Sequence, residues 1–233
     1  MWHTLRRYVF PPVCGFCHQT LLEDGCCSDC LASMQLYPKA SCQVCGVVLP
    51  ETLAPGPCGR CVQHAPPQQS TQSLFVYQGA VRDAILAWKL QGDDVGLRVL
   101  LRSAQGVLNS LIHDDDVLIP IPMPLSRMRQ RGRHHGADLC RMVADLSGAD
   151  WDWKLLRRQG VQARQSALTA PQRRKNLRKA FVLNPDYSNE GLHGTLWLVD
   201  DIITTGSTVY AAAHILRATG RPIRVLSLAR TLK

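Results

Sequence analysis

The most informative run in this sequence is Leu196-Trp197-Leu198-Val199-Asp200-Asp201-Ile202-Ile203-Thr204-Thr205-Gly206-Ser207-Thr208. Its first four residues are apolar and predict a short strand buried on both faces, as in a parallel sheet. Residues 209–217 predict a helix, which ends before Gly220. The acids and hydroxyls therefore lie between the carboxyl end of a strand and the amino end of a helix, where ligands bind in open α/β sheets. The run predicts an α/β fold.

The turn in this run has the chemistry of a phosphate site. Gly206 lets the backbone approach a ligand, and the helix that follows offers free N–H groups to an anion. The hydroxyl donors around the glycine are Thr204, Thr205, Ser207 and Thr208. Asp200 and Asp201 would repel a phosphate at close range, but they suit sugar hydroxyls one sugar-length away, or a metal. A ribose 5-phosphate meets both demands.

A structural interpretation of the same residues is a capped strand-to-helix turn with surface acids, because Ser and Thr often cap helices. We prefer the phosphate site because all of its features occur together and in order. The run contains neither G-x-x-x-x-G-K-[ST] nor G-x-G-x-x-G, so a nucleoside triphosphatase or a dinucleotide-binding protein has no support.

This run resembles the signature of the type I phosphoribosyltransferases, which bind 5-phosphoribosyl 1-pyrophosphate (PRPP). The resemblance implies a parallel sheet flanked by helices. It implies that Asp200 and Asp201 are the catalytic acids and hold the ribose hydroxyls, while Thr204 to Thr208 hold the 5-phosphate. It also implies that PRPP binds together with Mg²⁺.

Residues 1–66 contain four C-x-x-C pairs, and such pairs place two thiolates on one tetrahedral metal. The eight cysteines are Cys14, Cys17, Cys27, Cys30, Cys42, Cys45, Cys58 and Cys61. Disulfides are the competing interpretation, but an intracellular location disfavours them. The pairs predict two structural zinc ions, because four thiolates leave no open position for catalysis. Sequential pairing is the simpler arrangement, and a cross-braced arrangement uses the same residues.

The run 65–70 is rich in Pro and Gln and reads as a linker. We therefore expect a zinc-binding double Cys-knuckle region at residues 1–66 and a phosphoribosyltransferase-like domain at residues 67–233. Cys26 neighbours a predicted ligand, and Cys140 lies in an apolar helical pattern that predicts simple burial.

The net charge of +9 is concentrated in one segment. Residues 120–180 hold 14 Lys and Arg against 4 Asp and Glu, which favours a polyanionic partner, although a solvated basic surface is the alternative. Arg127 and Arg131 lie in a predicted loop suited to pyrophosphate or a nucleic-acid backbone. No apolar run reaches membrane-spanning length, and Met1 to Phe10 lack a secretory signal, so we expect a soluble cytoplasmic protein.

Other segments carry weaker signals. Helices are expected at 80–90, 96–112 and 137–146, and strands at 73–77, 181–183 and 223–228. Residues 117–124 predict a strand that runs into a proline-stiffened exit, and residues 151–158 predict a strand or a short helix. Lys89 either complements a helix end or contacts phosphate, and the helix end is slightly preferred. Residues 114–116 read as a solvated acidic loop. His134 and His135 read as a polar surface rather than as catalytic groups.

The whole chain resembles the ComF/GntX family of competence-associated proteins, through the four C-x-x-C pairs, the Arg127–Gly132 loop and the basic helix before the PRPP signature. The resemblance implies DNA handling in natural transformation, with single-stranded DNA as the polymer and proteins of the uptake machinery as partners. The nucleic-acid-binding residues expected in the basic helix are Arg173, Arg174, Lys175 and Arg178.

Three functions follow from these features. The first is an accessory protein of DNA uptake that binds PRPP and single-stranded DNA. The second is an active phosphoribosyltransferase that transfers the phosphoribosyl group to an acceptor. The third is a regulator that senses PRPP without turning it over. We favour the first, with the second as the alternative.

Overall fold

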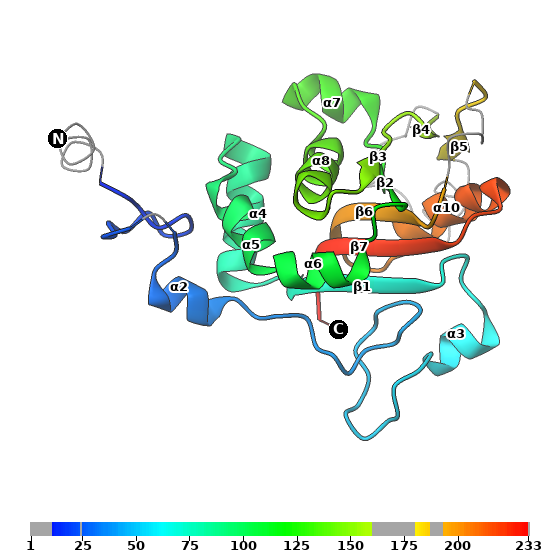
Figure 1. Ribbon diagram of the computed structural model, residues 1–233, viewed down its shortest axis with the longest axis horizontal. Coiled ribbons are helices and arrows are strands. Elements are labelled where there is room, and N and C mark those ends of the chain that lie inside the picture. The colour runs from blue at the N-terminus through cyan, green and yellow to red at the C-terminus, as the bar shows by residue number, and fades with distance from the viewer. Residues whose placement is uncertain (1–10, 24, 160–179, 187–192, 233) are drawn as a thin grey trace, which may run out of the picture.

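A computed structural model of the chain describes residues 11–23, 25–159, 180–186 and 193–232 (Figure 1). Its centre is a five-stranded sheet in the order β1-β7-β6-β2-β3, and every pairing between neighbours is parallel. The strands are β1 Ser70–Val76, β2 Val117–Pro120, β3 Asp150–Trp151, β6 Leu196–Ile203 and β7 Ile223–Arg230. The predicted class, a parallel α/β sheet flanked by helices with a small Cys-rich N-terminal region, is confirmed.

Helices cover both faces of this sheet, with α4, α5, α6 and α8 on one face and α10 on the other. Their bounds are α4 Gly79–Gln91, α5 Val95–Ser103, α6 Gln105–Leu111, α8 His135–Ser147 and α10 Ser207–Leu216. The first face buries Trp88 and Leu139 against Trp197 of β6, and the second buries Val209 against Leu198. Each large apolar side chain buried in this way contributes about 1.5–3 kcal/mol.

A small antiparallel sheet packs beside α10 and consists of β4 Leu156–Arg158 and β5 Phe181–Leu183. The short helices are α2 Ser28–Ser33, α3 Gly59–Gln63 and α7 Leu125–Arg131, and a 3₁₀ turn, η3, spans Arg217–Thr219. The strand or short helix expected at 151–158 is in fact the end of β3 and all of β4.

Strand β6 is longer than predicted and contains the acidic pair. Asp200 lies opposite Ser227, and the pairing with β7 continues to Ile203 opposite Arg230. The apolar pattern alone suggested an end at Val199. The strand continues because β7 offers an equally long parallel partner, so that backbone pairing extends past the apolar residues.

Two helix predictions differ from the structure. The helix expected at 96–112 is divided at Ala104 into α5 and α6, in a stretch where Ser103 and Gly106 are weak helix formers. The Arg127–Gly132 loop is mostly helical, because α7 ends only where Gly132 adopts the left-handed conformation, at φ 68°. Arg and Gln are good helix formers, so the local composition suits this helix.

The N-terminal region runs along the free edge of β1 (Figure 1). The backbone N–H of Tyr37 donates to Leu74 O over 2.9 Å, and Val76 N donates to Gln35 O over 2.9 Å. Further along the strand, Thr71 N donates to Gln43 O over 3.2 Å. Backbone groups that an edge strand would leave open are therefore paired with the Cys-rich segment.

Asp116 corrects the prediction of a solvated acidic loop. The residue is 3% exposed and accepts hydrogen bonds from Trp197 Nε1 and Thr195 N, each over 2.9 Å, and from His113 N over 3.1 Å. Burial alone would raise the pKa of Asp116, but these hydrogen bonds outweigh burial and hold it below its usual range. Asp116 thus ties the start of β2 to the start of β6.

Candidate functional site

Asp200 and Asp201 occupy the carboxyl-terminal half of β6, directly before the hydroxyl-rich turn. Asp201 N donates to Asp200 Oδ1 over 3.0 Å, which orients the first carboxylate. Strand β2 is the neighbour on one side, where Ile121 N donates to Val199 O over 3.1 Å. The exit of β2 and the acidic pair therefore meet at one edge of the sheet, as expected for a ligand site in an open α/β fold.

Lys89, for which a phosphate contact was the less favoured alternative, lies at this site through a partner that the sequence did not indicate. Its Nζ lies 2.7 Å from Asp201 Oδ2, and both side chains are largely buried, at 18% and 20% exposure. The preferred interpretation of Lys89, a complement to the end of its own helix, is therefore incomplete, because the ammonium pairs with an acid from another element. Lys89 thus neutralises the charge of Asp201, and the neighbouring Asp200 carboxylate has no such cationic partner at this distance among the described residues.

The pKa of Asp200 is raised from 3.8 to about 7. Burial is the largest cause, repulsion from Asp201 adds to it, and the Lys89 ammonium opposes both. Asp200 is thus poised to exchange a proton near neutral pH.

The raised pKa predicts a pH-dependent effect of Asp200→Asn on stability. Between the ordinary and the raised pKa the native state holds more protons than the unfolded state, so wild-type stability falls as the pH rises. A shift of about 3 units corresponds to about 4 kcal/mol, and because Asp200 is partly exposed we expect only about 1 kcal/mol to develop between about pH 5.5 and about pH 8. Asn cannot ionise and should escape this loss.

Urea unfolding of both proteins at the two pH values measures the effect. The variant should gain stability relative to wild type as the pH rises, and Asp83→Asn, which alters an exposed acid on α4, should show no such gain. An advantage of Asp200→Asn that is the same at both pH values would contradict the prediction.

The turn after β6 presents backbone N–H and hydroxyl donors, and among the described residues its hydroxyls bond only within the turn. Gly206 is the N-cap of α10 at φ 75°, no side chain caps the helix, and its first turn contains no acid. The Thr205 and Ser207 hydroxyls lie 2.7 Å apart, and Ser207 N reaches Thr205 Oγ1 only at 3.4 Å. A Cβ on Gly206 would meet no heavy atom within 4 Å, so the space above the glycine is open. The N-terminus of α10 is therefore free to bind an anion.

The arginines that follow β2 in the chain lie on α7 and β4. Arg127 is exposed on α7, while the side chain of Arg131 lies outside the described atoms. Arg158 was not singled out in the sequence; its Nη1 donates to Pro122 O over 3.3 Å, and its guanidinium lies 5.2 Å from the Phe181 ring. Burial and the nearby Arg127 charge lower the pKa of Arg158. No ion pair involves Arg127 or Arg158 within the described part of the chain.

The adjacent histidines are not the polar surface that the sequence predicted. His134 is the N-cap of α8, and its Nδ1 accepts a hydrogen bond from Ala137 N over 2.9 Å. His135 is 1% exposed and meets Trp88 edge to face, with ring centroids 5.1 Å apart.

The eight predicted ligand cysteines form two clusters. One contains Cys14, Cys17, Cys27 and Cys30, and the other Cys42, Cys45, Cys58 and Cys61. Within each cluster the sulfur atoms lie within 4.8 Å of one another, which fits one tetrahedral zinc per cluster with sequential pairing of the C-x-x-C turns. Cys26 belongs to neither cluster, and Cys140 is fully buried, as predicted.

The proposed nucleic-acid residues Arg173, Arg174, Lys175 and Arg178 lie outside the described residues. Among the helices that are described, none has the length and apolar character needed to cross a membrane.

Comparison with known proteins agrees with this architecture. Residues 5–62 match the double zinc ribbon domain, which supports the two structural zinc sites. The chain is 30% identical to the DNA utilization protein YhgH of Salmonella typhimurium, over 95% of this chain and 98% of that protein. It is 29% identical to competence protein F of Haemophilus influenzae, over 90% and 92%.

Among solved structures, the chain is similar to orotate phosphoribosyltransferase from Aeropyrum pernix, with 15% identity and a TM-score of 0.32 over 59% of this chain and 61% of that one. The full-length sequence matches, together with the double zinc ribbon, decide the classification. The chain belongs to the ComF/GntX family of competence-associated proteins.

Proposed function

We propose that this chain is an accessory protein of DNA uptake in natural transformation that binds PRPP and single-stranded DNA. The observation that carries the PRPP site is the acidic pair of β6 directly before a helix N-terminus that has neither a side-chain cap nor an acid. Relatives named for competence and DNA utilization support the wider role. We place the protein in the cytoplasm and the boundary between its two regions at residues 66 and 67.

In this proposal each element contacts one part of PRPP. The turn Thr204–Thr208 holds the 5-phosphate through backbone N–H groups and hydroxyls, and Asp200 and Asp201 accept hydrogen bonds from the ribose hydroxyls. Arg127, with Arg131 on the same helix, meets the pyrophosphate end. Mg²⁺ would supply charge neutralisation between the phosphates and the carboxylates.

Calorimetric titration of PRPP with Mg²⁺ into the wild-type protein tests the site. Saturable binding is expected, and it should weaken strongly when inorganic phosphate is present at high concentration, because both anions seek the same turn. Absence of saturable binding would reject the PRPP part of the proposal while leaving the DNA part standing.

An active phosphoribosyltransferase is the second candidate. Asp200, with a pKa of about 7 beside the neutralised Asp201, can take up or release a proton at the sugar, and the unpaired Arg127 and Arg158 can stabilise a leaving pyrophosphate. Release of pyrophosphate from PRPP in the presence of base or amine acceptors would favour turnover. Tight binding of PRPP without release favours the accessory role.

For DNA binding we predict a salt-dependent loss on removing two cations of the basic segment. Arg173→Ala/Arg174→Ala should weaken binding of single-stranded DNA and reduce the slope of log affinity against log salt by about 1.4, because each lost phosphate contact on a single strand removes about 0.7. Fluorescence anisotropy at several salt concentrations measures both quantities.

The matched control is Arg102→Ala/Arg217→Ala, which removes two exposed arginines elsewhere in the chain. The control should leave the salt slope unchanged. Equal slopes for wild type and Arg173→Ala/Arg174→Ala would reject these residues as the DNA contact.

A further inference from the structure

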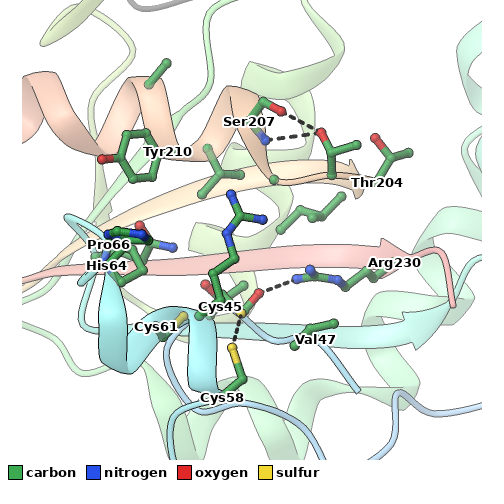
Figure 2. A pocket seen from close by; sticks show the side chains of 18 residues that line it. Cys45, Val47, Cys58, Cys61, His64, Pro66, Thr204, Ser207, Tyr210 and Arg230 are labelled. Carbon is green, nitrogen blue, oxygen red and sulfur yellow. Dashed lines mark hydrogen bonds between the residues drawn. The ribbon is translucent and has the colours of Figure 1, made fainter. Parts of the chain in front are cut away.

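A pocket of about 690 Å³ separates the second cysteine cluster from the N-terminus of α10 (Figure 2). One wall comes from the zinc-ribbon side, with Cys58, Cys61 and His64, and the opposite wall comes from α10, with Ser207 and Tyr210. Neither Asp200 nor Asp201 lines the pocket. It is therefore distinct from the sugar-binding face of the proposed PRPP site, although the two share the turn. The volume lies in the range of pockets for small organic ligands.

The turn end of the pocket is suited to a phosphate. Thr204, Thr205, Gly206 and Ser207 all line it, and they form the uncapped start of the ten-residue helix α10. Among the described residues, no aspartate or glutamate lines the pocket. The groups at this end are thus donors without a competing carboxylate.

Three basic side chains line the pocket: Arg60, His64 and Arg230. Arg230 is 7% exposed, and its Nη1 donates to Cys45 O over 2.6 Å. None of the three forms an ion pair with another described residue. The Arg230 guanidinium thus contacts the second cysteine cluster and, without a carboxylate partner, is available to a bound anion as well.

The opposite end of the pocket is suited to the part of a ligand that extends away from its phosphate. Cys45, Cys58 and Cys61 line this end, and thiolates that hold a zinc ion cannot donate hydrogen bonds, so the donors for a phosphate gather at the turn. Apolar surface comes from Val47, Pro66, Ile203, Val209, Tyr210 and Ala211. An apolar, flat group fits between these side chains.

Gln68 indicates that this flat group carries a hydrogen-bond donor. The residue lines the pocket and is 6% exposed, and its Oε1 accepts no hydrogen bond from the described residues. A buried carbonyl oxygen without a donor is costly, so a ligand that offers an N–H group is favoured. A nucleobase is a flat, largely apolar group that carries N–H donors.

We propose that this pocket binds a nucleoside 5′-monophosphate, with its phosphate at the Thr204–Ser207 turn and its base between Gln68 and Tyr210. The nucleotide is either free or forms the 5′-phosphorylated end of a single strand. The proposal goes beyond the proposed function because its ligand contacts neither Asp200 nor Asp201. Since both ligands place a phosphate in one turn, nucleotide and PRPP compete.

Titration of deoxyadenosine 5′-monophosphate into the full zinc-loaded chain tests the proposal. We expect saturable binding that is at least tenfold tighter than binding of 2-deoxyribose 5-phosphate, which lacks the base. Arg60→Glu reverses an exposed charge at the pocket and should weaken nucleotide binding about tenfold or more, because it removes one charge-assisted contact. Gln68→Leu should reduce the preference for the base-bearing ligand.

Two controls separate this result from general charge effects and from the PRPP site. Arg217→Glu reverses an exposed arginine outside the pocket and should leave nucleotide affinity unchanged. Asp200→Ala/Asp201→Ala should lose PRPP and keep the nucleotide, so failure of one site is distinguished from failure of the other. Equal affinity for the nucleotide and the base-free sugar phosphate, or equal effects of Arg60→Glu and Arg217→Glu, would overturn the proposal.

The source of the nucleotide is decided by a second pair of probes. A short deoxyadenosine oligonucleotide with a 5′-phosphate should compete with the monophosphate if strand ends bind, while the same oligonucleotide with a 5′-hydroxyl should not. Competition by neither, with the monophosphate still binding, assigns the pocket to the free nucleotide. No saturable binding of any of the three would overturn the proposal.

Discussion

Replacing Asp200 and Asp201 together by asparagine is expected to abolish measurable binding of PRPP with Mg²⁺. Each carboxylate would otherwise accept a charge-assisted hydrogen bond worth about 1.5–3 kcal/mol, so the pair accounts for about 100-fold in affinity or more. Asparagine keeps the size and shape of both side chains, and the strand pairing of β6 through Asp200 and Ser227 uses the backbone alone. Calorimetry on variant and wild type measures the loss.

The chain contains a matched control for this variant in Asp114 and Asp115, two adjacent exposed acids before β2. Asp114→Asn/Asp115→Asn changes the net charge equally and should retain PRPP affinity. The first variant frees Lys89 from its partner, so its fold is checked by zinc content and thermal unfolding. Undiminished binding in Asp200→Asn/Asp201→Asn would remove the acids from the site and leave the turn as an anion site only.

Replacing Cys61 by serine is expected to remove one of the two zinc ions and to unfold the second cysteine cluster. Structural zinc contributes about 10–16 kcal/mol of apparent binding free energy in zinc-finger peptides, far more than a ribbon of this size gains from its apolar contacts. Cys61 is buried in the cluster and lines the pocket beside α10. Zinc content should therefore fall from two ions per chain to one.

Zinc released by a thiol-modifying reagent and quantified with a chelating dye provides the measurement. Cys26→Ser is the control, because Cys26 lies next to the ligand Cys27 in the chain but belongs to neither cluster. Its Sγ donates instead to Cys27 O over 3.3 Å. This control should keep both ions. Two tightly held ions in Cys61→Ser would contradict the assignment of Cys61 as a ligand.

Those parts of the molecule that depend on local pattern could be predicted from the sequence. The C-x-x-C spacing predicts the two clusters because each turn constrains two sulfur atoms locally. The β6 run and the hydroxyls after it predict a strand, a turn and a helix because each feature lies within a few residues of the next. The sheet class follows from buried apolar strands that alternate with helices.

Features that depend on tertiary packing could not be predicted. Lys89 pairs with Asp201 only because α4 packs against the face of the sheet at the height where β6 ends. Asp116 reads as one of three loop acids until Trp197 of the neighbouring strand is placed beside it. The pocket joins residues near position 60 to residues near position 205, and no pattern within the sequence connects them.

The hydrogen bonds between the Cys-rich segment and β1 limit how this protein can be divided. The change in composition near residue 66 suggests two separable pieces, but residues 35–43 donate to and accept from the backbone of β1 at three places. A shortened chain that begins at residue 67 would carry a long bare strand at the margin of its sheet, and bare strands of this kind recruit one another. The zinc-binding region thus covers the edge of β1 and prevents self-association through it, and the same region forms one wall of the pocket. A chain without this region would lose both.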